Sequence, residues 1–316
     1  MKIAVKIAAG FLAALVLLAV MFIAATYAPD RSVLDLKARW AKAPSVFLDV
    51  SGMKVHLRDE GPLDDPSPII LIHGTSSSLH TWEGWVRLLK GQRRVICFDL
   101  PGFGLTGPSP DNDYTIANYV RFMKAMLDRL GIRHCVLAGN SFGGWVAWET
   151  ALALPERIDR LILVDANGYP RNSTSIPIGF RVARIPVLNR LLDMTLPRRI
   201  VASSVREVYG DPSRVTPELV DRYYEITLRA GNRHALVERF KEAQPGFDAY
   251  RIRELKLPTL ILWGGRDRLI PPDNAARFHR DIAGSRLVIF DTLGHVPQEE
   301  DPVRTAAAAM KFLDIK

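Results

Sequence analysis

The feature that most constrains the fold of this chain is a series of short, continuous apolar runs. Six runs of four residues occur at 69–72, 95–98, 135–138, 161–164, 260–263 and 287–290. Uninterrupted apolar strands are typical of a parallel sheet that is buried on both faces. Helical patterns separate many of them, at 81–89, 116–130, 142–154, 273–282 and 303–313. This alternation predicts an α/β fold in which helices cover both faces of a largely parallel sheet.

Two segments depart from the alternation. Near the start, 46–50 and 54–58 flank the turn-forming Ser51-Gly52-Met53, which predicts a β-hairpin. Further on, residues 168–253 interrupt the pattern with a long and mostly helical stretch. We therefore divide the body into a polar, helix-compatible linker, a first core part, a helical insertion and a second core part, at 29–44, 45–167, 168–253 and 254–316.

The first 28 residues predict a membrane segment. Lys2 and Lys6 precede an uncharged run of 22 residues, which as a helix would span about 33 Å and cross a hydrocarbon core of about 30 Å. Basic residues before the span predict an N-terminus inside and a body outside the cytoplasm, periplasmic in a bacterium. The alternative is a signal peptide, cleaved to leave a secreted or periplasmic protein. Its apolar region usually has about 7–15 residues, and Pro29 follows the best small-residue site, Ala28.

The net charge of +8 raises the question of nucleic-acid binding. Residues 168–253 carry 15 Lys and Arg against 9 Asp and Glu, and the two N-terminal lysines supply the rest of the excess. Because no nucleic-acid-binding module accompanies this charge, we expect no nucleic-acid partner. Cys97 and Cys135 fall on predicted buried strands, where we expect packed free thiols, and no zinc-binding pattern occurs.

The sequence at 139–143 matches the pattern G-x-S-x-G, with Ser141 at its centre. It follows a predicted strand and opens a predicted helix, which is the context that this nucleophile motif needs. Small residues on both sides allow a sharp turn that raises the hydroxyl above the sheet, and Gly144 allows the helix to pack closely on the neighbouring chain. We therefore expect Ser141 to be a nucleophile.

A serine hydroxyl needs a positioned base, and seven histidines compete for this role. His295 lies in a loop directly after the last predicted strand, whereas His73 is expected to hold a loop in place. The histidine in turn needs a carboxylate that fixes its tautomer. Asp267 follows the penultimate strand, so the order Ser141, Asp267, His295 suits a hydrolase triad. Asp165, at the end of the strand before, is the alternative carboxylate.

Acyl transfer also requires N–H donors for the oxyanion that develops at the carbonyl. We expect one from the backbone of Phe142, directly after the nucleophile, and the other from Thr75 in the loop after 69–72. Gly74 would keep that loop open for close approach of a substrate. We expect Gly74, His80 and Trp145 to line the substrate pocket.

Five motifs in this order resemble the α/β-hydrolase superfamily: His73-Gly74, residues 99–104, residues 139–143, the Asp267 loop and His295. The resemblance covers about 46–316. It implies an α/β-hydrolase fold with a mostly parallel eight-stranded sheet, and it makes 168–253 the helical cap inserted after strand 6. Serine at position 141 argues against the members that use aspartate as nucleophile.

The expected activity is hydrolysis of a hydrophobic carboxylic ester through an acyl-enzyme, as in carboxylesterases and lipases, without a metal or organic cofactor. Residues 139–141 and the Asp267 loop are also similar to those of carbon–carbon bond hydrolases that cleave ring-fission products of aromatic compounds. Those enzymes typically carry Met where this chain has Phe142, and they lack an anchor. A non-catalytic small-molecule-binding protein of the same fold is the alternative from another class.

The predicted cap mixes apolar and basic residues in its first half, from 176 to 199. Such a surface suits an anionic lipid leaflet, to which each nearby basic residue contributes about 1 kcal/mol. One hypothesis is therefore that the cap faces the membrane and that the enzyme takes apolar acyl substrates from it. The other is that the cap is solvated and its apolar side only covers the active site.

Overall fold

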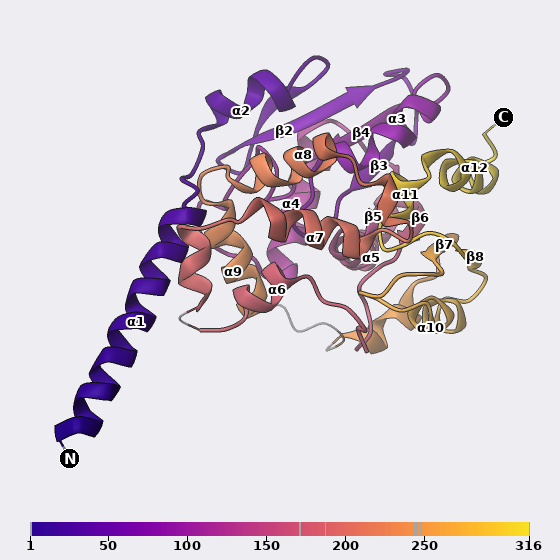
Figure 1. Ribbon diagram of the computed structural model, residues 1–316. Coiled ribbons are helices and arrows are strands. Elements are labelled where there is room, and N and C mark those ends of the chain that lie inside the picture. The colour runs from indigo at the N-terminus through magenta and orange to yellow at the C-terminus, as the bar shows by residue number, and fades with distance from the viewer. Residues whose placement is uncertain (1, 171, 187, 243–245, 247, 316) are drawn as a thin grey trace.

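The structure is a computed structural model that describes residues 2–170, 172–186, 188–242, 246 and 248–315 (Figure 1). Its core is an eight-stranded sheet with the order β1-β2-β4-β3-β5-β6-β7-β8. The strands are β1 Val46–Val50, β2 Met53–Glu60, β3 Ile69–Ile72, β4 Val95–Phe98, β5 Cys135–Asn140, β6 Ile158–Val164, β7 Thr259–Gly264 and β8 Arg286–Phe290. Strand β2 runs antiparallel to both of its neighbours, and the strands from β4 to β8 are parallel. The predicted α/β-hydrolase fold is confirmed.

The central strands are apolar along their whole length because both faces of the sheet are covered. In β3, Ile69 and Leu71 pack in one hydrophobic cluster, and Ile70 and Ile72 pack in the other. Successive side chains of a strand point to opposite faces, so a strand covered on both sides has no solvent-facing position. The core therefore consists of two layers, one on each side of the sheet.

Two sets of helices provide this cover. Helices α3 Glu83–Leu89 and α12 Pro302–Phe312 contact each other on one face, and α3 is preceded by a 3-10 turn, η1 Leu79–Trp82. Helices α4 Ile116–Arg129, α5 Phe142–Ala153 and α10 Asp273–Asp281 bury their apolar residues on the other. The two cysteines are free and buried on opposite faces, as expected.

A helical segment separates β6 from β7 and lies over one edge of the sheet (Figure 1). Its helices are α6 Ile178–Ala183, η3 Leu188–Asp193, α7 Arg198–Val208, η4 Pro212–Arg214, α8 Pro217–Thr227, α9 Asn232–Glu242 and η5 Ala249–Glu254. We refer to α6 through α9 as the cap. Parallel strands present their carboxyl ends at one edge of the sheet, so the loops after β3, β5, β6, β7 and β8 meet beneath it.

Helix α1, Lys2–Thr26, projects away from the body (Figure 1). Its stretch Val5–Thr26 is long and apolar enough to cross a membrane, a test that a signal sequence also passes. The following segment, expected as a linker, contains α2 Val33–Trp40. This helix packs on α8 with Leu36 and Trp40 buried, and the Trp40 indole donates a 2.7 Å hydrogen bond to Glu225. The segment is therefore attached to the body.

Candidate active site

Ser141 lies in a tight turn between β5 and α5. Its backbone has φ +56° and ψ −116°, a conformation that non-glycine residues rarely adopt. Neighbouring chain holds the turn in place, because the Ser141 N–H donates to Val164 O at 2.9 Å and the Asn167 N–H donates to Ser141 O at 2.9 Å. The strained turn places the serine above the carboxyl end of β5, where its side chain lines a cavity.

The glycines around Ser141 are required by close backbone contacts. A Cβ at Gly139 would collide with the carbonyl of Gly143, and one at Gly143 would collide with the carbonyl of Ile72. A Cβ at Gly144 would lie 2.5 Å from the Cβ of Ala166, in the loop after β6. The glycine pattern in the sequence therefore follows from the tight packing of α5 against the sheet.

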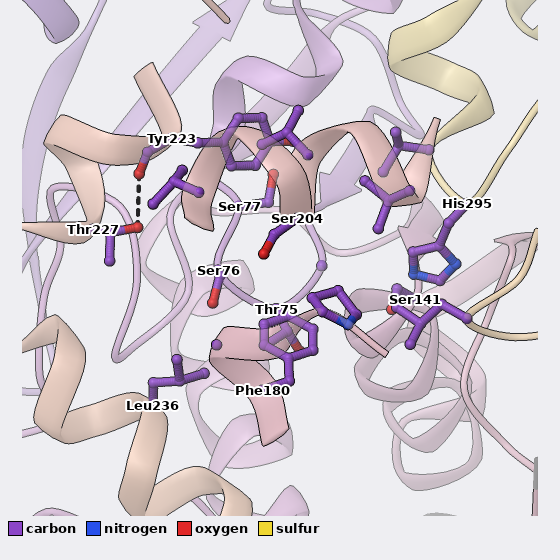
Figure 2. Close-up of a pocket in the computed structure, with 18 of the residues that line it drawn as sticks. Thr75, Ser76, Ser77, Ser141, Phe180, Ser204, Tyr223, Thr227, Leu236 and His295 are labelled. Carbon is purple, nitrogen blue, oxygen red and sulfur yellow. Dashed lines mark hydrogen bonds between the residues drawn. The ribbon is translucent and has the colours of Figure 1, made fainter. Parts of the chain in front are cut away.

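His295 is held by Asp267. The two side chains are buried, and His295 Nδ1 lies 2.7 Å from Asp267 Oδ2. The other oxygen, Oδ1, accepts the backbone N–H groups of Leu269 at 2.8 Å and Ile270 at 2.9 Å. A proton on Nδ1 leaves Nε2 free to accept one, and Figure 2 shows the imidazole beside Ser141. A nucleophile, a base and an orienting carboxylate require an arrangement of this kind.

Asp165, the alternative carboxylate, lies beside the same pair. Its Oδ1 accepts the Gly264 N–H at 3.0 Å, and ligand atoms of Asp165, Asp267 and His295 lie within 4.8 Å of one another. Complete burial, followed by the neighbouring charge of Asp267, raises the pKa of Asp165 well above its ordinary value. Burial therefore favours the protonated form of Asp165, and Asp267 is the carboxylate bonded to His295.

Two backbone N–H groups are available for an oxyanion. Phe142 is the first residue of α5, and Thr75 lines the cavity next to Ser141. Neither N–H has an acceptor within the described part of the chain. Glycine at position 74 allows the Thr75 loop to lie close to Ser141, since a Cβ at Gly74 would lie only 3.1 Å from the Ser141 Cβ. The arrangement has the parts of an oxyanion hole.

His73 supports this loop, as predicted from the sequence. Its Nε2 accepts the Leu100 N–H at 3.0 Å, so the ring proton is on Nδ1, which donates to Gly74 O at 2.7 Å. Burial lowers the pKa of His73, which keeps the ring neutral. His73 therefore positions the loop that carries Thr75.

The prediction that His80 and Trp145 line the substrate pocket is wrong, since neither contributes to the cavity at Ser141. His80 turns toward α2, with its Nε2 2.8 Å from Trp40 O, and lines a separate cavity. Burial, then the nearby Arg222, lowers the pKa of His80 to about 3. Trp145 packs in the core against Phe142, because α5 is buried on all sides.

Two residues that the sequence analysis missed hold the His295 loop. The side chain of Asn140 donates to His295 O at 3.0 Å and to Val164 O at 3.1 Å. The buried carboxylate of Glu300 accepts the N–H groups of Gly294, Gly210 and Asp211 at 2.8–2.9 Å. Asn140 adjoins Ser141 in the motif, whereas the role of Glu300 depends on its contact with the cap.

A cavity extends from Ser141 and His295 under the cap (Figure 2). Core loops contribute small and polar residues near the serine, including Gly74, Thr75 and Asn140. The cap contributes mainly apolar side chains, among them Pro177, Phe180, Leu192, Leu196, Ile200 and Val201. The cavity therefore suits a largely apolar substrate with a reacting group at the serine.

Comparisons with known proteins agree with this architecture. A sequence model of the alpha/beta hydrolase fold matches residues 67–302. The chain is 30% identical over 261 residues to 2-hydroxy-6-oxo-2,4-heptadienoate hydrolase from Pseudomonas putida, which covers 79% of this chain and 88% of that enzyme.

Two solved structures have a similar fold. The meta-cleavage product hydrolase from Pseudomonas fluorescens IP01 gives a TM-score of 0.73 at 26% identity, covering 86% of this chain and 97% of that one. A membrane phospholipase A described as a bacterial virulence factor gives a TM-score of 0.73 at 23% identity, covering 99% and 98%. At 23% identity the second similarity concerns the fold alone.

Proposed function

The chain belongs to the α/β-hydrolase family, and on this basis we propose that it is a serine hydrolase with Ser141 as nucleophile, His295 as base and Asp267 as orienting carboxylate. The observation that carries the proposal is the 2.7 Å hydrogen bond between His295 Nδ1 and Asp267 Oδ2, with the imidazole beside the strained Ser141 (Figure 2). Without such a base a serine hydroxyl is a poor nucleophile at neutral pH.

The reaction begins when Nε2 of His295 takes the proton of Ser141 Oγ and the oxygen adds to a substrate carbonyl. The N–H groups of Phe142 and Thr75 stabilise the oxyanion, and Asp267 stabilises the imidazolium. The histidine then protonates the leaving group, which departs and leaves an acyl-enzyme. A water molecule activated by the same histidine hydrolyses this intermediate and restores Ser141.

For the substrate we propose a carboxylic ester with an apolar acyl chain. The apolar side chains of the cap support this choice, because they would enclose a hydrocarbon chain bound to the serine. The adjoining apolar helix α1 supports it as well, since lipophilic substrates are concentrated in membranes.

Hydrolysis of a carbon–carbon bond in a ring-fission product is the second candidate. The relatives with a named activity favour it more than ester hydrolysis, because enzymes named for such products reach 30% identity over most of the chain. Both reactions start with addition to a carbonyl carbon, so the same three residues serve either. Those enzymes typically have methionine where this chain has Phe142, and this difference favours ester hydrolysis.

The deciding experiment compares the full-length protein with S141A. We expect turnover of p-nitrophenyl esters and labelling by a fluorophosphonate probe, and the loss of both in S141A. Labelling that persists in S141A would refute the assignment of the nucleophile. A parallel assay with a vinylogous 1,5-diketone dienoate and with a phospholipid separates the two candidate reactions, and binding without turnover of either substrate would indicate the non-catalytic alternative.

We further propose that α1 is retained as an anchor and that the cap faces the membrane, with the body outside the cytoplasm. The root of α1 is hydrogen-bonded to the cap through Ala28 N to Met194 O at 3.0 Å and Leu196 N to Thr26 O at 3.2 Å. Two large apolar side chains at this junction, Tyr27 and Met194, are exposed. A helix attached in this way would keep the cap close to the bilayer.

Two measurements test the anchor and the orientation. After carbonate extraction the tagged protein should stay in the membrane fraction, and its release would contradict the anchor. The body without residues 1–28 should bind vesicles containing anionic lipid, with binding weakened by salt. Binding independent of anionic lipid and salt would favour a solvated cap.

A further inference from the structure

Arg233 is a buried cation at the wall of the cavity that contains Ser141. It is only 3% exposed and belongs to the residues that line this cavity. Within the described part of the chain, its Nε and Nη1 have no hydrogen-bond partner. Arginine stays protonated in proteins, and a buried guanidinium with unpaired N–H groups is costly. An anionic partner would remove this cost.

Asp30, the acidic residue next to Arg233, pairs with only one of its three guanidinium nitrogens. Asp30 accepts Nη2 of Arg233 at 2.7 Å and also the Gly231 N–H at 3.1 Å. Its side chain is 44% exposed, so water weakens its effect on the buried cation. A second cation, Arg229, lies just before α9. Its Nη1 and Nη2 donate to the carbonyls of Ala230 and Thr106, and its buried Nε has no partner among the described residues. The surroundings of Arg233 therefore remain positive.

Arg233 shares its helix with Leu236, which lies across the cavity from the reacting serine in Figure 2. Arg233 lies on α9 one turn before Leu236, and both line the cavity. In Figure 2, Leu236 and Thr227 lie on the opposite side of the cavity from Ser141 and His295. The apolar cap residues lie along the cavity wall. A ligand that reached both ends would need a reactive carbonyl, an apolar middle and an anionic terminus.

We propose that Arg233 binds an oxyanion, a carboxylate or a phosphate, which the substrate carries at the end remote from the bond that is cleaved. This inference rests on the proposed hydrolase function and specifies its substrate class as anionic amphiphiles. Nε and Nη1 of the guanidinium are two unpaired cationic donors, and either can donate a charge-assisted hydrogen bond to an oxygen of a carboxylate or a phosphate.

The test uses two esters of equal chain length, p-nitrophenyl octanoate and the mono-p-nitrophenyl ester of octanedioic acid, with full-length protein in detergent. We expect R233Q to lower the ratio of kcat/KM for the anionic ester to that for the neutral ester by about 10- to 100-fold, mainly through KM. Damage to the fold reduces both rates and leaves the ratio unchanged. R190Q removes an exposed cap arginine and should preserve the ratio.

A second arm uses the wild-type protein and distinguishes the two anions. Octyl phosphate and octanoate are compared with octanol as inhibitors, and the stronger inhibitor identifies phosphate or carboxylate as the preferred group. An unchanged ester ratio in R233Q, or inhibition by both anions no stronger than by octanol, would overturn the inference. If neither ester is hydrolysed, the proposed ester hydrolysis has failed, and calorimetric binding of the same three compounds to the wild type and R233Q still tests Arg233.

Discussion

The backbone N–H of His295 donates a 2.7 Å hydrogen bond to the carbonyl of Val208, the last residue of α7. The histidine proposed as the base is therefore attached directly to the cap. Its neighbour Gly294 packs against Gly210, where a Cβ on either residue would collide with the other loop. The cap thus encloses the substrate cavity and also helps to position the base.

The first prediction concerns Glu300, which joins these two loops. E300A removes the acceptor of three N–H groups, that of buried Gly294 and those of half-buried Gly210 and Asp211, and a buried unsatisfied group costs about 1–3 kcal/mol. We expect the free energy of unfolding to fall by about 2–4 kcal/mol and kcat to fall at least tenfold. Urea unfolding and ester turnover measure the two effects. E218A, which removes an exposed cap glutamate, is the control, and equal behaviour of the two variants would contradict the role of Glu300.

The second prediction separates the two buried aspartates. D267N replaces the charged partner of His295 and should lower kcat by about 10³–10⁴-fold, since the wrong histidine tautomer is then favoured. D165N replaces a carboxyl group whose pKa is raised by burial and which makes no hydrogen bond to His295 in the described part of the chain, so we expect kcat within about threefold of the wild type. Steady-state kinetics check both variants. A large loss of kcat in D165N together with a small loss in D267N would mean that Asp165, and not Asp267, is the carboxylate that orients His295.

The third prediction concerns the pH dependence of stability. Because folding raises the pKa of Asp165, the folded protein binds more protons than the unfolded chain above pH 3.8. The contribution of Asp165 is therefore fully present below pH 3.8 and is lost as pH rises toward the folded pKa, by up to about 1.4 kcal/mol per pH unit between these two values. Urea unfolding from pH 5 to 8 should show the wild type losing stability relative to D165N. A constant difference would refute the raised pKa.

The fourth prediction concerns Gly144. G144A would place a Cβ 2.5 Å from that of Ala166, which forces α5 away from the sheet. Overpacking of this kind costs about 1–3 kcal/mol, and we also expect lower activity because α5 starts at the Ser141 turn. G91A is a matched control, since a Cβ there has no atom within 4 Å. Thermal unfolding and ester turnover would show no difference between the variants if the close packing were unimportant.

Much of the framework was predictable from local sequence. Strand β3 has the predicted bounds because a strand buried on both faces must be apolar at every position. Ser141, Asp267 and His295 could be nominated because each follows a predicted strand, and parallel strands present their carboxyl ends at one edge. Position along the chain therefore indicated proximity in space.

Other features depended on contacts between distant segments. The sequence analysis placed His80 and Trp145 in the pocket, but α2 engages His80 and the core surrounds Trp145. The contacts of Arg233 with Asp30 and of Glu300 with Gly210 join segments about 200 and 90 residues apart. The sequence by itself determined the order of strands and of chemical groups, because burial imposes a local pattern on each strand. Only the tertiary structure decided which side chains face the cavity, because this depends on how the cap and the N-terminal segment pack onto the core.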